Sequence, residues 1–125
     1  MTTIAETRQY LADLVATAAG PAWTGTPYIP GAITAPAVLV TPASPYVESG
    51  ITYGSYNLRT VVSLAVRPGS NDTVTEELDA AIEDAVVALV NAGVLVESVS
   101  QPYGLGSSNA EFLAVDITTT TPITL

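Results

Sequence analysis

Carboxylates are the side chains of this sequence with the widest chemical scope. Glu76, Asp79 and Glu83 are three and four residues apart, so a helix would bring them near one another on its surface. Such a group could form an acid pair for catalysis or bind Mg²⁺ through oxygen. Acids opposite an apolar stripe are more usually a solvated helix face, and that is the interpretation we expect here.

The chain lacks the side chains that most other catalytic mechanisms require. It contains no histidine, cysteine or lysine, and therefore no Ser-His pair, thiolate nucleophile, Schiff base or histidine metal cluster. The segment GLGSSN at 104–109 has glycines of the kind that hold phosphates, but it joins two predicted strands, whereas phosphate loops precede a helix. We predict that the protein is not an enzyme, with no catalytic, cofactor-binding or metal-ligating residues and no cofactor.

The charge balance excludes ordinary nucleic-acid binding. Three arginines stand against twelve acids, for a net charge of -9, whereas proteins that hold phosphates need many basic side chains. Each of Arg8, Arg59 and Arg67 could pair with a nearby acid on its own surface or cross a subunit interface, where a bidentate arginine sets the register. The sequence leaves both possibilities open.

Two amphipathic helices are predicted to position these side chains. Apolar residues recur at helical spacing over 3–19, and again over about 73–92. Thr3 and Thr73 each precede a glutamate by three residues, which is the pattern of a capping box. Gly93 is placed to end the second helix.

About four strands complete the predicted fold. The run PAVLVT over 36–41 reads as a strand that Pro42 and Pro45 end, because proline cannot donate to a ladder. Residues 56–67 alternate between apolar and polar side chains, with the even positions facing the core.

The last two strands, 94–100 and 111–119, are expected to form a hairpin through the loop that contains Gly104 and Gly106. We therefore expect a single α+β domain over 1–125. Its two layers are a mainly antiparallel sheet of about four strands and two helices packed on one face, with a long loop or hairpin arm.

The arm is the part of the chain most suggestive of function. Within 20–56 the sequence is rich in proline, glycine and aromatic residues, and long unstructured loops in compact domains are usually functional or disordered. Disorder of residues 20–36 is one interpretation. Packing on neighbouring protein is the one we favour, because interfaces collect aromatic side chains and disordered segments lack them. The expected contact residues are Trp23, Tyr28, Ile29, Tyr46, Tyr53 and Tyr56, together with Arg59 and Arg67.

The N-terminal segment MTTIAETRQYL has neither the basic nor the apolar region of a signal peptide. The longest nearly apolar run, AVVALVNAGVLV, is too short to span a bilayer. These features predict a soluble protein with no membrane partner.

The assembled pattern resembles the tail terminator proteins of long-tailed (siphovirus-type) bacteriophages. The likeness rests on an acidic chain of this size with an N-terminal helix, a strand starting PAVLV, a proline- and tyrosine-bearing excursion, a strand like YNLRTVVSLAV, a helix like VTEELDAAIEDAVVALV and a closing hairpin. The resemblance implies a ring, probably hexameric in that family, that ends polymerisation of the tail tube and joins it to the head. It also implies tube and connector proteins as partners, and a place at the head-proximal end of the virion tail after assembly in the host cytoplasm.

In such a ring DNA would pass without specific binding, because an acidic lumen repels phosphates. Glu76, Asp79 and Glu83 would then face the lumen or solvent. Three alternatives remain open: another head-to-tail connector or tube subunit, a small-ligand-binding module with an aromatic pocket, and a carboxylate-dependent enzyme.

Overall fold

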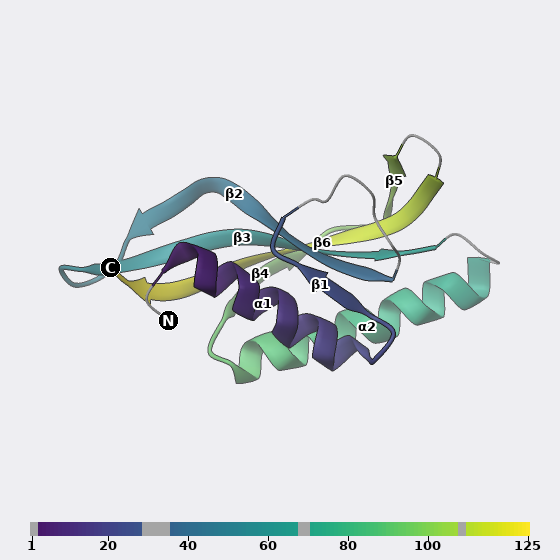
Figure 1. Cartoon of the computed structure of the whole chain (residues 1–125), viewed down its shortest axis with the longest axis horizontal. Coiled ribbons are helices and arrows are strands. Elements are labelled where there is room, and N and C mark those ends of the chain that lie inside the picture. Colours follow the sequence, from purple (N-terminus) through teal and green to yellow (C-terminus); the bar gives the residue numbers. More distant parts are fainter. Residues whose placement is uncertain (1–2, 29–35, 68–70, 108–109) are drawn as a thin grey trace.

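The computed structural model describes residues 3–28, 36–67, 71–107 and 110–125, and these form two helices and one mixed sheet of six strands. Both helices contribute side chains to one core on the same face of the sheet (Figure 1), which confirms the predicted α+β class. The elements are α1 (Ile4–Ala19), β1 (Thr24–Thr26), β2 (Ala37–Ser49), β3 (Ser55–Val66), α2 (Asn71–Asn91), β4 (Leu95–Val99), β5 (Tyr103–Ser107) and β6 (Ala110–Thr124).

The helix ends follow the capping residues of the sequence. At α1 the Thr3 hydroxyl accepts a hydrogen bond from the Glu6 N–H at 3.0 Å, as the capping pattern predicts. Gly93 has φ +83 and ends α2 in the left-handed region that favours glycine. The helix α2 begins at Asn71, two residues before the approximate start predicted at Thr73, because polar and acidic residues there also suit a first turn. Thr73 therefore lies within the helix, and the prediction that it is the N-cap is wrong.

The sheet has the order β1-β2-β3-β6-β4, with β5 paired to the remaining length of β6. All pairs are antiparallel except the short parallel pair of β1 with β2. The two strands beyond the predicted four are β1 and β5. The segment with Gly104 and Gly106 is therefore a strand and not a loop, because β6 is 15 residues long and β4 covers only part of its edge.

The prediction that Pro42 and Pro45 end their strand is also wrong. β2 continues through both prolines to Ser49, with a register shift against β3 between Pro42 and Val47. Beyond Leu39 the outer edge of β2 pairs with no other described strand, and proline is tolerated on an edge because its missing N–H has no ladder partner there. The prolines thus protect an edge from further pairing.

The core lies between the helices and the sheet. The even positions of β3 predicted to face inward, from Leu58 to Val66, are all buried, and the alternate residues Val115 and Ile117 of β6 join them. The threonine run continues β6 as predicted, and Thr119 is fully buried against β3. This arrangement leaves the distal ends of β2 and β3 as a hairpin that extends beyond α1 (Figure 1).

Candidate functional site

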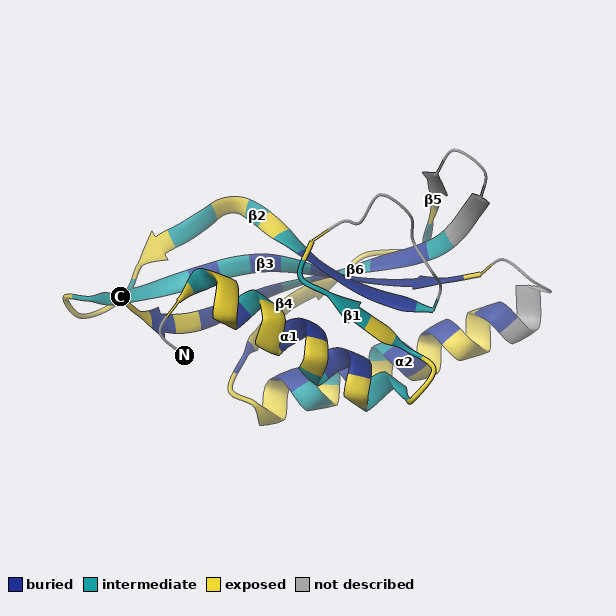
Figure 2. Ribbon diagram, viewed as in Figure 1, coloured by how far each residue is buried: buried dark blue, intermediate teal, exposed yellow. Residues whose placement is uncertain are grey.

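The end of the β2–β3 hairpin exposes two large apolar side chains completely. Ile51 and Tyr53 have relative exposures of 102% and 108%, so neither touches enough of its own chain to lose any surface. Figure 2 shows this tip as largely exposed, in contrast to the buried residues toward the other end of the same strands. We call the segment 49–56 the hairpin tip.

Backbone hydrogen bonds hold the hairpin tip in shape. The Gly50 N–H donates to the Ser55 carbonyl at 2.7 Å, and the Ser55 N–H donates to the Thr52 carbonyl at 3.0 Å. Gly54 has φ +78, and its carbonyl accepts from the Leu125 N–H at 2.9 Å, which joins the end of β6 to the tip. The exposed side chains are thus carried by an ordered turn rather than by a loose loop.

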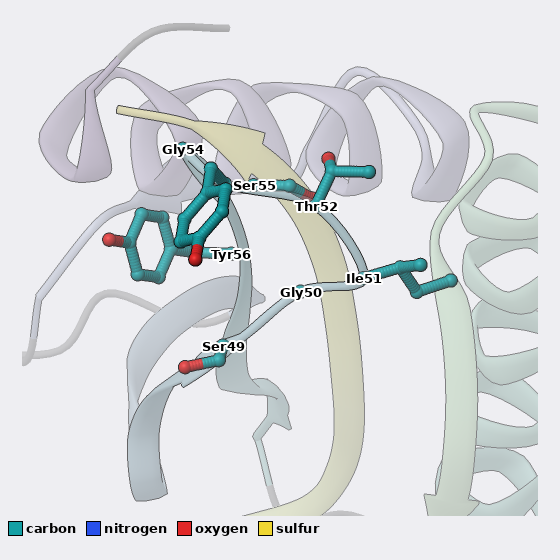
Figure 3. Close-up of a pocket in the computed structure, with 8 residues that line it drawn as sticks. Ser49, Gly50, Ile51, Thr52, Gly54, Ser55 and Tyr56 are labelled. Carbon is teal, nitrogen blue, oxygen red and sulfur yellow. The ribbon is translucent and has the colours of Figure 1, made fainter.

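A shallow hollow of about 480 Å³ lies within the tip, lined by residues 49–56. In Figure 3 the side chains of Ile51 and Tyr56 lie on opposite sides of the loop. Tyr56 is half-buried in β3, opposite Ser49 and Ile123. The tip therefore unites two of the predicted interface tyrosines, Tyr53 and Tyr56.

The other predicted aromatic residues lie elsewhere. Trp23 is half-buried and packs against the core of its own chain, beside a second hollow formed by α1 and β1. Tyr28 is 59% exposed, and Tyr46 is half-buried in the irregular part of β2. Ile29 lies outside the described residues.

A third hollow forms an apolar groove between the two helices. Its cavity of about 370 Å³ is lined by Tyr10, Leu14 and Ala18 of α1 and by Ala88 of α2, with Asp13 and Thr17 as its polar members. Val87 and Val90, further residues of α2, are more than half exposed. We call this third hollow the helix groove.

The acids predicted to share a helix surface do lie on α2, where Glu76, Asp79 and Glu83 are all exposed. Among the described residues no group of three or more acidic side chains is arranged to hold a metal ion. Half of the twelve acids belong to α2, which has no arginine, so this helix concentrates the negative charge of the chain.

Arg59 is engaged within its own chain. Its Nε and Nη2 donate to the two carboxylate oxygens of Glu97, each at 3.2 Å, and its Nη1 donates to the Ser44 carbonyl at 2.8 Å. Thr120 donates to the same carboxylate at 2.7 Å. The hydrogen bond from Arg59 lowers the pKa of Glu97, and the same bond raises the pKa of Arg59.

This network ties β2, β3, β6 and β4 together across the face opposite the helices. Of the two open possibilities for Arg59, the structure shows the intramolecular ion pair. Arg67 is exposed at the end of β3, and the Nε of Arg8 is buried without a hydrogen-bond partner in the described structure.

A second polar cluster surrounds Asp116, on the face of the sheet opposite the helices. Its Oδ1 accepts from the Ser63 hydroxyl at 2.7 Å and from the Tyr103 hydroxyl at 2.8 Å. Burial, followed by the hydrogen bond to Asp116, raises the pKa of Tyr103 to about 12. This cluster lies apart from the three hollows and anchors β5 to the sheet.

Sequence reasoning missed Ile51, the helix groove and the partner of Arg59. An isoleucine between Gly50 and Gly54 of the predicted arm was a usable signal, because such glycines favour a turn and apolar residues are uncommon where a turn meets solvent. The groove had no such signal, because it forms only where Ala88 of α2 comes to lie beside residues 10–18 of α1.

No described helix is both long and apolar enough to cross a bilayer. The sequence profile of no known protein family matches this chain, and no curated protein matches it either.

Proposed function

We propose that this chain is a structural protein that assembles into a ring, and that the ring ends the tail tube of a long-tailed bacteriophage and joins it to the head. The observation that carries the proposal is the hairpin tip, where Ile51 and Tyr53 are fully exposed at the end of an extended hairpin. Large apolar side chains without an intramolecular role are typical of surfaces that other proteins cover.

The order of elements supports this assignment. An N-terminal helix, a strand that starts at Ala37, a long hairpin, an acidic helix and closing antiparallel strands follow one another in the structure. This is the order on which the resemblance to tail terminators rests. Partly open sheet edges, at β4 and along β2 beyond Leu39, also suit a protein whose edges are covered in an assembly.

Charge supports the second half of the proposal. A ring of six copies would carry a net charge of roughly -54, and the exposed acids of α2 would line its channel. An acidic channel keeps DNA from adhering, because the phosphates meet like charge and no basic partner. In this assembly Glu76, Asp79 and Glu83 face the lumen.

A small-ligand-binding module is the competing function, and the three hollows of the described structure, that of the hairpin tip among them, support it. Ligand pockets usually bury most of the ligand surface. Side chains as exposed as Ile51 and Tyr53 cannot enclose a ligand in one subunit, so the assembly role is preferred.

The test is a measurement of mass over a range of concentrations. Native mass spectrometry and light scattering should show an assembly of about 77 kDa built from 12.8 kDa subunits, and negative-stain images should show rings. Added salt should favour assembly, because it screens the repulsion between acidic subunits.

The double variant Ile51→Ser/Tyr53→Ser should stay monomeric with an unchanged circular dichroism spectrum, while Thr52→Ser at the same exposed turn should assemble normally. A wild-type chain that stays monomeric up to its solubility limit, at both low and high salt, would refute the ring.

A further inference from the structure

Two apolar surfaces on this chain differ in shape and in position. The hairpin tip projects from one end of the sheet (Figure 1), whereas the helix groove is a hollow lined by residues of α1 and α2. A projecting surface and a hollow surface on one molecule meet the geometric condition for a heterologous contact, in which unlike patches of two copies join.

Charge selects these same surfaces for self-association. Two copies with a net charge of -9 repel each other wherever their acids approach. The hairpin tip, residues 49–56, contains no charged side chain, and Asp13 is the one charged residue that lines the helix groove. A contact between the tip and the groove therefore has a smaller electrostatic cost than a contact that involves the acidic outer surface of α2.

The sizes of the two surfaces are compatible. A hollow of about 370 Å³ falls within the range of clefts that hold small organic ligands, so it has room for one or two side chains. An aromatic side chain alone buries roughly 150–250 Å². With Ile51 and the adjoining backbone we estimate that the tip buries roughly 400 Å², about half of what one partner buries in a standard interface.

A contact of that area is weak when it stands alone. In a closed ring each subunit makes the contact twice, once with its tip and once with its groove, so closure makes the assembly much more stable than an isolated pair. The estimated area thus favours a ring over a dimer.

We propose that the hairpin tip of one copy docks in the helix groove of the next, with Ile51 and Tyr53 placed between Tyr10, Leu14 and Ala88. This inference rests on the ring proposed above and names the contact that builds it. The occupant of the groove is a second copy of this chain.

The test uses the absence of cysteine from the chain, which allows cysteines to be introduced in pairs without background. Chains with Ile51→Cys are mixed with chains carrying Ala88→Cys and treated with a short bismaleimide. The matched control replaces Ala88→Cys by Ala80→Cys, an exposed alanine two turns earlier on the same helix.

The expected result is a covalent heterodimer from the 51 and 88 pair and little or none from the 51 and 80 pair. A single chain with cysteines at both 51 and 88 should give a ladder of products up to the mass of the ring. As an independent arm, Ala88→Leu narrows the groove and should raise the dissociation constant about tenfold or more, with an unchanged circular dichroism spectrum.

The outcomes separate the two proposals. A ring of the expected mass without the 51 to 88 cross-link overturns the docking inference and leaves the ring standing. Cross-links of Ile51→Cys chains to each other, without heterodimers, show tips that meet in a two-fold dimer and overturn it as well. Equal yields from the 80 and 88 positions mean that the cross-links arise from random collision, and they too overturn the docking inference. If no assembly of any size forms, the ring proposal itself is overturned.

Discussion

Two fully buried threonines face each other across β3 and β6, and their hydroxyls allow a sharp test of the core. Thr60 pairs with Thr119 in the sheet register, and their Oγ1 atoms are 2.8 Å apart. The Thr119 hydroxyl also lies 3.3 Å from the Thr60 carbonyl oxygen, to which it donates. Since a hydroxyl has one hydrogen, Thr60 must then be the donor to Thr119.

This assignment predicts unequal costs for replacement by valine, which keeps the side-chain shape. Thr119→Val removes both hydrogen bonds and leaves the Thr60 hydroxyl buried without a partner, which should lower the free energy of unfolding by about 2 kcal/mol. Thr60→Val removes one hydrogen bond and leaves Thr119 its carbonyl acceptor, so the expected loss is about 1 kcal/mol.

The double variant should be more stable than Thr119→Val alone. With both hydroxyls gone, no buried hydroxyl of the pair lacks a partner, and the expected loss falls to about 0.5 kcal/mol. The sum of the single losses exceeds this, so the coupling free energy is about 2.5 kcal/mol.

Urea denaturation followed by circular dichroism measures these free energies, at a protein concentration where the chain is monomeric, because assembly would add its own stability. In thermal melts each kcal/mol should shift the midpoint by about 3–5 °C at this chain length. Thr124→Val, an exposed position of the same strand, is the control and should change the free energy by less than about 0.5 kcal/mol. Equal losses for the two single variants, or additive losses in the double variant, would refute the reasoning.

Three further predictions concern single positions. Thr121 is 5% exposed and its hydroxyl has no hydrogen-bond partner in the described structure, so Thr121→Val should raise the free energy of unfolding by about 1 kcal/mol in urea melts; an unchanged or lower value would contradict this. The pKa of Tyr103 is raised to about 12, so the stability that its neutral phenol contributes is complete below about pH 10 and is lost as pH rises through 12. A titration of phenolate absorbance should show one tyrosine ionising late, and Tyr103→Phe should remove that step; a late step that survives would assign it to another residue. A Cβ on Gly25 would run into the Ala12 carbonyl oxygen, so Gly25→Ala should cost about 2 kcal/mol or more in a thermal melt, whereas Gly104→Ala, with open space around it, should cost less than about 0.5 kcal/mol. Equal costs at the two glycines would show that β1 is not held against α1.

The sequence was informative wherever a structural feature depends on near neighbours in the chain. The N-cap at Thr3, the helix end at Gly93 and the alternation of β3 each involve residues within a few positions of one another. Hydrophobic periodicity then sufficed for the α+β class, because two apolar stripes and an apolar sheet face must cover each other.

The tertiary structure alone decided features that depend on a distant partner. Pro42 and Pro45 are compatible with a strand because β2 lies at an edge beyond Leu39, and no local pattern states which strand is at an edge. The glycine-rich segment of β5 is a strand because β6 is long enough to pair with it. Arg59 finds its carboxylate 38 residues further along the chain.

The candidate site also combines features that the sequence predicts with features that depend on distant residues. The sequence predicted Tyr53 and Tyr56 as residues of an interface arm, since aromatic residues in a segment rich in proline and glycine are a compositional signal. Only the packing of the chain determined that Trp23 contacts the core while Ile51 and Tyr53 remain uncovered. Composition is a property of the chain alone, whereas exposure depends on which other segments come near, and residues far apart in the sequence fix that.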